Sequence, residues 1–168
     1  MFSTDAIEAD NKADFYAQLA DFARGLVHGE TDAIANAANL AALLYHMLPD
    51  VNWAGFYFMR PLENGGRELV VGPFNGKPAC VRIALGKGVC GTAAETRQTQ
   101  RVADVDAFPG HIPCDAASRS EVVVPLLRGD EVIGVLDIDS PMPDRFDADD
   151  QAGLERIARI AEESLALL

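Results

Sequence analysis

The chain of 168 residues is poor in basic residues, and it has no long apolar run. Its 14 lysines and arginines stand against 26 acidic residues, which gives a net charge of −12 at pH 7. No basic cluster is available to neutralise phosphate groups, so nucleic acids and anionic membrane surfaces are disfavoured as partners. The excess of acid is typical of a solubilising surface, although an acidic pocket would also suit a ligand that carries an ammonium group.

Segments that would direct the chain to a membrane are not found in the sequence. No apolar run reaches the roughly 20 residues of a membrane-spanning helix, and the first residues do not form a basic stretch followed by an apolar one. We therefore expect a cytoplasmic protein with no membrane partner. The length fits one domain, residues 1–168, with a full core.

The chain has only three cysteines, Cys80, Cys90 and Cys114. An odd number excludes a closed disulfide framework, and no pair has the C-x2-C spacing, so we expect no metal site. In a reducing compartment such thiols are either inert core residues or redox-active. All three fall in expected loops, which favours a redox role. Cys90 also precedes an expected helix, whose N-terminus would stabilise a thiolate.

Periodicity and turn residues predict helices at both ends of the chain and strands in the middle. The expected helices are residues 12–27, 33–47, 91–96 and 147–167, and the expected strands are residues 51–59, 68–72, 81–85, 100–102, 121–127 and 132–139. Residues 104–118 form a long irregular loop, a feature that is usually functional. The order predicts an α+β fold in which an antiparallel sheet carries the terminal helices on one face and the irregular loops on the other.

Three acidic residues lie in or beside apolar strands. Asp137 and Asp139 are two residues apart and share a strand face with Ile133, and a hairpin turn at residues 128–130 brings Glu121 close to them. Three neighbouring carboxylates raise the pKa of at least one. A protonated carboxyl is a candidate proton donor, and an ionised one can hold an ammonium group. The alternative is a solvated strand end.

Two further side chains have alternative roles. Trp53 is the only tryptophan, and it either packs in the core or forms an aromatic wall for an apolar group of a ligand. His111 lies three residues before Cys114 and is either a base for that thiol or an ordinary loop histidine.

Several motifs together resemble the free methionine-(R)-sulfoxide reductases, which are small enzymes with a GAF-type fold. The motifs are Asn-Trp-Ala-Gly-Phe-Tyr (residues 52–57), Gly-Pro-Phe-x-Gly-Lys-Pro-Ala-Cys (72–80), Gly-Val-Cys-Gly-Thr (88–92), His-Ile-Pro-Cys-Asp-Ala-Ala-Ser (111–118), Ser-Glu (120–121) and Gly-Val-Leu-Asp-Ile-Asp-Ser (134–140). The resemblance runs over nearly the whole chain. It implies a GAF-like sheet with a small closed pocket, and reduction of free methionine (R)-sulfoxide by thiols without a metal or an organic cofactor.

The resemblance also implies roles for the three thiols. Cys114 is the attacking thiol by position, and Cys90 and Cys80 are its resolving partners, with an exchange of roles between Cys114 and Cys90 as the alternative. Attack on the sulfoxide sulfur leaves a sulfenic acid on the enzyme. A second cysteine converts this to a disulfide, which thioredoxin reduces by exchange.

The remaining roles concern binding. Glu121, Asp137 and Asp139 bind the sulfoxide oxygen through a shared proton and the substrate ammonium through charge, and Trp53 packs on the substrate methyl group. A homodimer is one option for the assembly. The alternative functions are a GAF sensory module that binds a small molecule, since fold alone does not decide function, and a thiol redox sensor without turnover.

Overall fold

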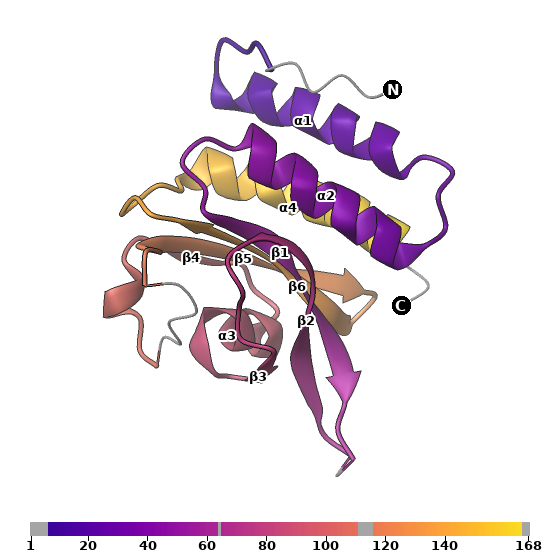
Figure 1. Ribbon diagram of the computed structural model, residues 1–168, viewed down its shortest axis with the longest axis vertical. Coiled ribbons are helices and arrows are strands. Elements are labelled where there is room, and N and C mark those ends of the chain that lie inside the picture. Colours follow the sequence, from indigo (N-terminus) through magenta and orange to yellow (C-terminus); the bar gives the residue numbers. More distant parts are fainter. Residues whose placement is uncertain (1–6, 64, 111–115, 166–168) are drawn as a thin grey trace.

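The computed structural model describes residues 7–63, 65–110 and 116–165. Its central element is a six-stranded antiparallel sheet (Figure 1). The strand order is β3-β2-β1-β6-β5-β4. The elements of the described residues are α1 (Lys12–Val27), α2 (Ala33–Met47), β1 (Trp53–Pro61), β2 (Arg67–Gly76), β3 (Arg82–Ala84), α3 (Gly88–Thr96), β4 (Gln100–Val102), the 3-10 helix η1 (Val105–Ala107), β5 (Ser120–Arg128), β6 (Glu131–Ser140) and α4 (Ala148–Ser164).

The helices divide between the two faces of the sheet. Helices α2 and α4 pack on one face, and α1 lies outside them, mainly against α4 (Figure 1). Helix α3 covers the other face beside β5 and β6. The predicted α+β fold, with helices from both ends of the chain on one side, is confirmed, although α1 forms a third layer. Within the described part of the chain, no helix is both long and apolar enough to cross a bilayer.

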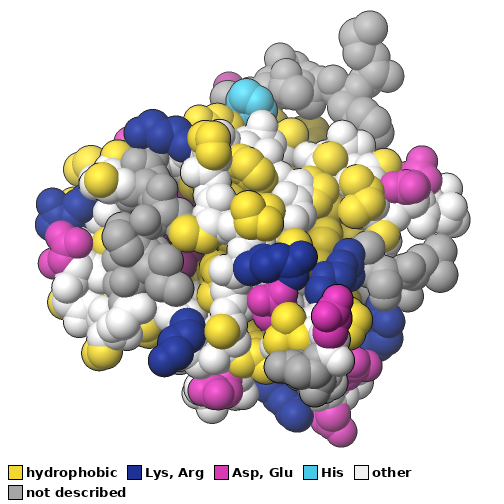
Figure 2. Space-filling model, turned by 60° about the horizontal axis from the view of Figure 1, so that its bottom comes forward, with side chains coloured by type: hydrophobic (Ala, Val, Ile, Leu, Met, Phe, Trp, Pro, Cys, Tyr) yellow, Lys and Arg dark blue, Asp and Glu magenta, His cyan; other side chains and the backbone are white. Residues whose placement is uncertain are grey.

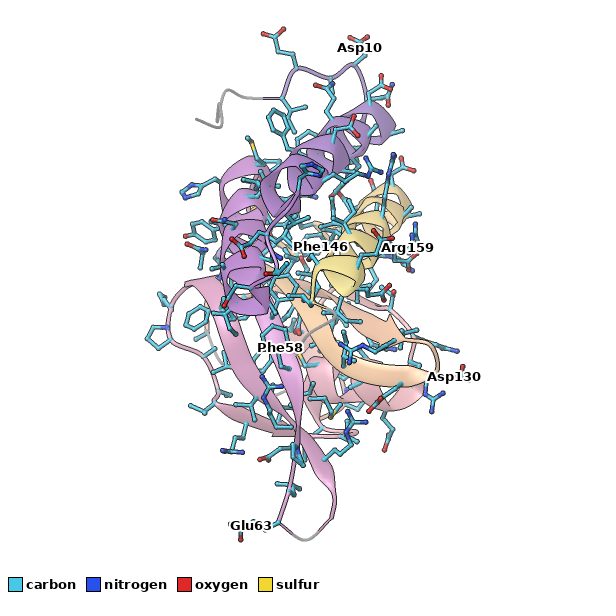
Figure 3. The ribbon with its side chains drawn as sticks, turned by 90° about the vertical axis from the view of Figure 1, so that its right-hand side faces the viewer. Asp10, Phe58, Glu63, Asp130, Phe146 and Arg159 are labelled. Atoms are coloured by element: carbon cyan, nitrogen blue, oxygen red, sulfur yellow. The ribbon has the colours of Figure 1, made fainter. Side chains whose placement is uncertain are left out.

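The sheet separates two apolar clusters. The larger cluster lies between the sheet and α1, α2 and α4, and it includes Phe58 and Phe146, which are labelled in Figure 3. The smaller cluster lies on the α3 side and includes Trp53, Tyr57 and Cys90. Because neighbouring residues of a strand point to opposite faces, each central strand contributes to both clusters.

Side-chain caps explain why the helices begin where they do. Helices α1 and α2 span the predicted residues, and each is preceded by an N-cap side chain, Asn11 and Asp32, that accepts a backbone N–H hydrogen bond. Asp147 caps α4 and forms a capping box with Asp150.

Strand β2 is longer than the sequence predicts, and the extra residues pair with the start of β1. The predicted strand of residues 68–72 becomes Arg67–Gly76, in which Phe74 is opposite Gly55 and Gly76 is opposite Trp53. The β1–β2 hairpin extends away from the sheet with Glu63 near its tip (Figure 3).

A β-bulge in β6 corrects the predicted position of Ile133. Leu126 is opposite Gly134, whereas Leu127 is opposite Val132, so Ile133 is an additional residue in its strand. The bulge reverses the alternation, and Ile133 joins the helix-side cluster instead of sharing a face with Asp137. The backbone N–H of Leu127 donates to the Glu162 carboxylate of α4 at 2.7 Å.

A buried carboxylate links α1 to α4. The Asp150 side chain is 1% exposed. It accepts hydrogen bonds from the Tyr16 hydroxyl at 2.8 Å, the Lys12 ammonium at 2.6 Å and the Arg145 guanidinium at 3.1 Å. Gly153 allows this close packing, because a Cβ there would lie 2.1 Å from Tyr16 Cγ.

Candidate active site

Three site side chains lie in one row across the centre of the sheet. Trp53 of β1 is opposite Asp139 of β6, and Asp139 is in turn opposite Glu121 of β5. Asp137 lies two residues before Asp139 and is opposite Gly55. All four side chains line the same pocket on the α3 face of the sheet, so the predicted convergence of the three acids is present.

Gly55 makes room for the indole ring of Trp53. A Cβ at Gly55 would lie 2.8 Å from the ring and 2.3 Å from Phe74 Cβ. The indole stacks on Phe74 at a centroid distance of 5.1 Å and on Tyr57 at 5.8 Å. Its N–H donates to the Lys77 carbonyl at 3.1 Å. Trp53 is therefore buried in the core and also lines the pocket, and its predicted contact with an apolar group of a ligand remains a prediction.

A glycine-rich turn brings Cys90 over the acids. Gly86 and Gly88 have φ values of +72° and +58°, which other residues rarely adopt, and they turn the chain from β3 into α3. Gly91 lets α3 approach the backbone of β3, because a Cβ there would lie 2.4 Å from the Ala84 carbonyl oxygen. Cys90 is consequently the third residue of α3 and is 4% exposed.

The thiol of Cys90 contacts two of the carboxyl groups. Its Sγ atom lies 3.3 Å from Oδ2 of Asp137 and 4.0 Å from Oε1 of Glu121. Both carboxyl side chains are 6% exposed. Apolar residues such as Val89, Val123 and Val135 belong to the same buried cluster, so the three polar groups are largely removed from water.

Burial controls the protonation of the acid pair. It raises the pKa of Glu121 well above its ordinary value, and the charges of Asp137 and Asp139 raise it further. Burial also raises the pKa of Asp137 to about 7, although hydrogen bonds from Cys90 and Glu121 lower it. Asp137 is therefore close to its midpoint at neutral pH, and both burial and the neighbouring charges favour the protonated form of Glu121.

The expected stabilisation of a Cys90 thiolate by the helix N-terminus is outweighed by the surroundings of the thiol. Burial raises the pKa of its thiol well above the ordinary value, and the neighbouring charges of Asp137 and Glu121 add to this effect. Desolvation and two nearby acids outweigh the partial charge of one short helix. The expectation that Cys90 lies in an irregular loop is wrong, because it belongs to α3.

The pocket combines an acidic floor with a basic rim. Its volume is about 40 Å3, which favours a small ligand over a nucleotide or a tetrapyrrole. Lys77 and Lys87 are exposed at its edge. Ser118 also lines it, and the Ser118 hydroxyl accepts a hydrogen bond from the Asn52 amide at 3.1 Å.

The structure describes one of the three remaining predicted residues, Cys80, but not Cys114 or His111. Cys80 is half-buried and packs against the apolar cluster of Trp53 and Cys90, next to the pocket residue Ala79. Cys114 and His111 lie outside the described residues. Their predicted roles remain predictions.

Sequence reasoning missed the two lysines at the edge of the pocket and the hydrogen bond that Asn52 donates to Ser118. Lys87 lies within the glycine turn, and Asn52 and Ser118 are the ends of two motifs that had been recognised for their cysteine or tryptophan. Position in those motifs was therefore the only available signal. The contact between Asn52 and Ser118 joins positions 66 residues apart, and a linear pattern does not reveal such a pair.

The surface on the α3 side has mixed charge. In Figure 2 the Lys and Arg side chains of this face lie among acidic and hydrophobic ones and do not form one continuous basic area. The expectation that nucleic acid is disfavoured as a partner stays a prediction.

The pocket also contains a set of metal-binding donor atoms. Cys90, Glu121 and Asp137 each offer one ligand atom, and these atoms lie within 4.8 Å of one another. The expectation that the protein uses no metal or organic cofactor therefore stays a prediction.

Comparisons with known proteins place this geometry in a family. Residues 39–166 match the GAF domain family. The free methionine-R-sulfoxide reductase of Escherichia coli is 52% identical over 156 residues, which are 93% of this chain and 92% of that protein.

Two solved structures extend the comparison. The free methionine-R-sulfoxide reductase of Neisseria meningitidis, solved in complex with its substrate, is 41% identical with a TM-score of 0.90, and the match covers 99% of this chain and 96% of that chain. A protein of Burkholderia vietnamiensis described as a candidate GAF sensor is 60% identical with a TM-score of 0.85, over 93% of this chain and 99% of that one. The predicted resemblance is confirmed: the chain belongs to the free methionine-R-sulfoxide reductase family of GAF-domain proteins.

Proposed function

We propose that this protein reduces free methionine (R)-sulfoxide to methionine. The relatives named for this activity support the proposal. The observation that carries it is a buried Glu121 carboxyl, whose pKa is raised by desolvation, beside a thiol in a small acidic pocket. Sulfoxide reduction by thiols requires a proton for the departing oxygen, and a neutral buried carboxyl supplies it.

The first step transfers oxygen from the substrate to an enzyme thiol. The thiol, which we assign to Cys114 from the sequence, attacks the sulfoxide sulfur while Glu121 protonates the oxygen. A bond forms between the enzyme sulfur and the substrate sulfur as the S–O bond breaks, and the oxygen leaves as water after it takes a second proton from solvent. A water molecule then attacks the enzyme sulfur and returns that proton, the S–S bond breaks with its electron pair on methionine, and the enzyme sulfur becomes a sulfenic acid, so that the net change is the transfer of one oxygen atom. The proton released by the thiol returns to Glu121 through solvent, so atoms and electrons balance.

The second step restores the thiol. Cys90 or Cys80 condenses with the sulfenic acid to give a disulfide and water, and a dithiol protein of the thioredoxin class reduces that disulfide by exchange. An exchange of roles between Cys114 and Cys90 is the alternative. The raised pKa of Cys90 argues against Cys90 as the thiol that attacks the substrate first, because that thiol must ionise readily.

The charges of the pocket suit a free amino acid. Asp137 and Asp139 hold the substrate ammonium, and the indole of Trp53 packs on the methyl group. The substrate carboxylate lies near the rim, where Lys87 and the N-terminus of α3 favour negative charge. A peptide-bound residue has an amide in place of the ammonium, so it would not balance the negative charge of the two carboxylates.

The test is a product assay on the separated epimers of free methionine sulfoxide, with dithiothreitol as reductant. We expect methionine from the R epimer only, and little product from N-acetylated methionine sulfoxide. Equal rates on both epimers, or no methionine at all, would overturn the proposal. Comparable rates on the free and the N-acetylated substrate would remove the assigned role of Asp137 and Asp139.

Rapid mixing without reductant separates the roles of the thiols. Cys114→Ser should give no methionine, whereas Cys90→Ser and Cys80→Ser should each release about one methionine per chain, because only regeneration is blocked. A burst from Cys114→Ser together with its loss in Cys90→Ser would exchange the two assignments.

A sensor without turnover is the second candidate, and the description of the Burkholderia relative favours it. It predicts that methionine sulfoxide or another small molecule binds without forming product. Repeated turnovers per chain with dithiothreitol would exclude it.

A further inference from the structure

One cluster of the pocket has a composition that amino acid binding does not explain. A substrate ammonium needs carboxylates and hydrogen-bond acceptors, but it gains little from a thiol. In this pocket Cys90 lies directly against the acid pair, and all three side chains are buried. A thiolate with two carboxylates is instead a donor set for a metal ion of intermediate softness.

The spacing of the donor atoms fits a small tetrahedral ion. With Zn–S near 2.3 Å and Zn–O near 2.1 Å, tetrahedral geometry separates the ligand atoms by about 3.5 Å. The Sγ atom of Cys90 lies 3.3 Å from Asp137 and 4.0 Å from Glu121. Shifts of about half an ångström, within the reach of side-chain rotation, would bring the three donors around one ion.

A second observation points to a missing ligand. Among the described residues, Oδ1 of Asp137 is buried and has no hydrogen-bond partner, and the side chain is 6% exposed. Buried carboxylate oxygens rarely remain without a partner, because the lost hydration is not replaced. The other oxygen of this carboxyl, Oδ2, faces the Cys90 sulfur, so a cation that binds both oxygens of Asp137 would also satisfy Oδ1.

We propose that Cys90, Glu121 and Asp137 form a binding site for one divalent cation of the zinc class. The single thiolate favours Zn2+ over Mg2+ and Ca2+, which prefer oxygen ligands. Three protein ligands leave the fourth position open to the pocket. Binding displaces the Cys90 thiol proton and any carboxyl proton to the buffer, and no oxidation or reduction takes place.

The bound ion would regulate the proposed reaction. It occupies Asp137, which holds the substrate ammonium together with Asp139, and it displaces the proton from Glu121, so metal and substrate exclude one another. It would also protect Cys90 from oxidation. This consequence rests on the proposed function, whereas the metal site itself does not.

Cobalt is a spectroscopic probe for the site. We expect Co2+ added to the reduced, metal-free protein to produce a thiolate-to-metal absorption band in the near ultraviolet that saturates at one ion per chain. Zn2+ should then remove the band by displacement. Absence of the band, or saturation well above one ion per chain, would overturn the inference.

Variants identify the ligands. Cys90→Ser should abolish the band, and Asp137→Asn and Glu121→Gln should each weaken Co2+ binding by at least about tenfold, since even partners outside the coordination sphere contribute that much. Cys80→Ser is the matched control and should keep the band. A band that survives in Cys90→Ser or disappears in Cys80→Ser would contradict the assignment. Circular dichroism verifies that each variant is folded, and the two carboxyl variants provide the test if Cys90→Ser does not fold.

Activity measurements distinguish this inference from the proposed function. In EDTA the wild-type protein should form methionine, and Zn2+ should inhibit competitively with methionine (R)-sulfoxide. Activity in EDTA without any Co2+ band would refute the metal site and leave the reductase intact. A Co2+ band without methionine formation would support the site and refute the reductase, and Zn2+ inhibition that substrate does not relieve would refute the competition.

Discussion

The buried carboxyl of Asp137 should make the stability of the protein fall as the pH rises. Its pKa is about 7 in the folded protein, against an ordinary value of 3.8. Between these values the folded state keeps a proton that the unfolded state has lost, and stability therefore decreases with increasing pH. The decrease continues until the folded carboxyl has ionised, above about pH 7.

The size of the effect follows from the two pKa values. Linkage gives a loss of about 2–3 kcal/mol between about pH 5 and about pH 8 for this one group. Glu121 acts in the same direction, because its pKa is also raised. Asp137→Asn removes the titrating group and keeps the shape of the side chain. As the pH increases from about 5 to about 8, we expect the difference in unfolding free energy between the variant and wild type to shift in favour of the variant by about 2–3 kcal/mol.

Urea unfolding at several pH values measures this difference. The fluorescence of Trp53, the only tryptophan and 3% exposed, reports unfolding. The argument uses the change with pH and not the absolute stability, since an amide in place of the carboxyl has its own pH-independent cost. Asp149→Asn on the exposed start of α4 is the control and should follow wild type. Parallel pH profiles for Asp137→Asn and wild type would refute the reasoning.

Three further predictions concern chemistry, packing and access. Glu121→Gln should slow the methionine burst by about 10²–10⁴-fold because the amide cannot deliver the proton, while Asp149→Asn should leave it unchanged; a normal burst in Glu121→Gln would move the acid role elsewhere. Gly153→Ala should destabilise the protein by about 1–3 kcal/mol in thermal unfolding, since its Cβ would lie 2.1 Å from a tyrosine ring of α1. Gly25→Ala, with open space at its Cβ, should instead stabilise α1 by about 0.5–1 kcal/mol, and equal effects of the two would contradict this packing. Iodoacetamide should label Cys90 of the reduced protein much more slowly in the native state than in urea, as followed by mass spectrometry, because the thiol is buried and its pKa is raised; equal rates would show that the thiol is accessible.

Local signals in the sequence were sufficient for several elements. Helices α1 and α2 occur at the predicted residues, because apolar periodicity and cap residues act within one or two turns. The approach of Glu121 to Asp137 and Asp139 was also predictable, since a short hairpin turn fixes which residues of two strands are opposite. The motifs indicated the family, which the comparisons confirm.

Contacts between distant segments decided the rest. The sequence alone put Ile133 on the wrong face, since a bulge depends on the pairing of both strands and on the Glu162 side chain that accepts from the Leu127 N–H. The strand predicted from the sequence was also shorter than β2. The additional residues of β2 adopt strand structure because they pair with Gly55 and its neighbours in β1.

The protonation of the site is the clearest example. The sequence by itself determined that three acids would lie close together, because hairpin pairing is a property of the chain, and the family resemblance implied that thiols would join them at one pocket. Only the tertiary structure decided that the pKa values of Cys90 and Glu121 are raised, since the pKa depends on how completely α3 and the sheet exclude water. Desolvation arises from the packing of α3 on β5 and β6, segments far from one another in sequence, and no local pattern encodes it.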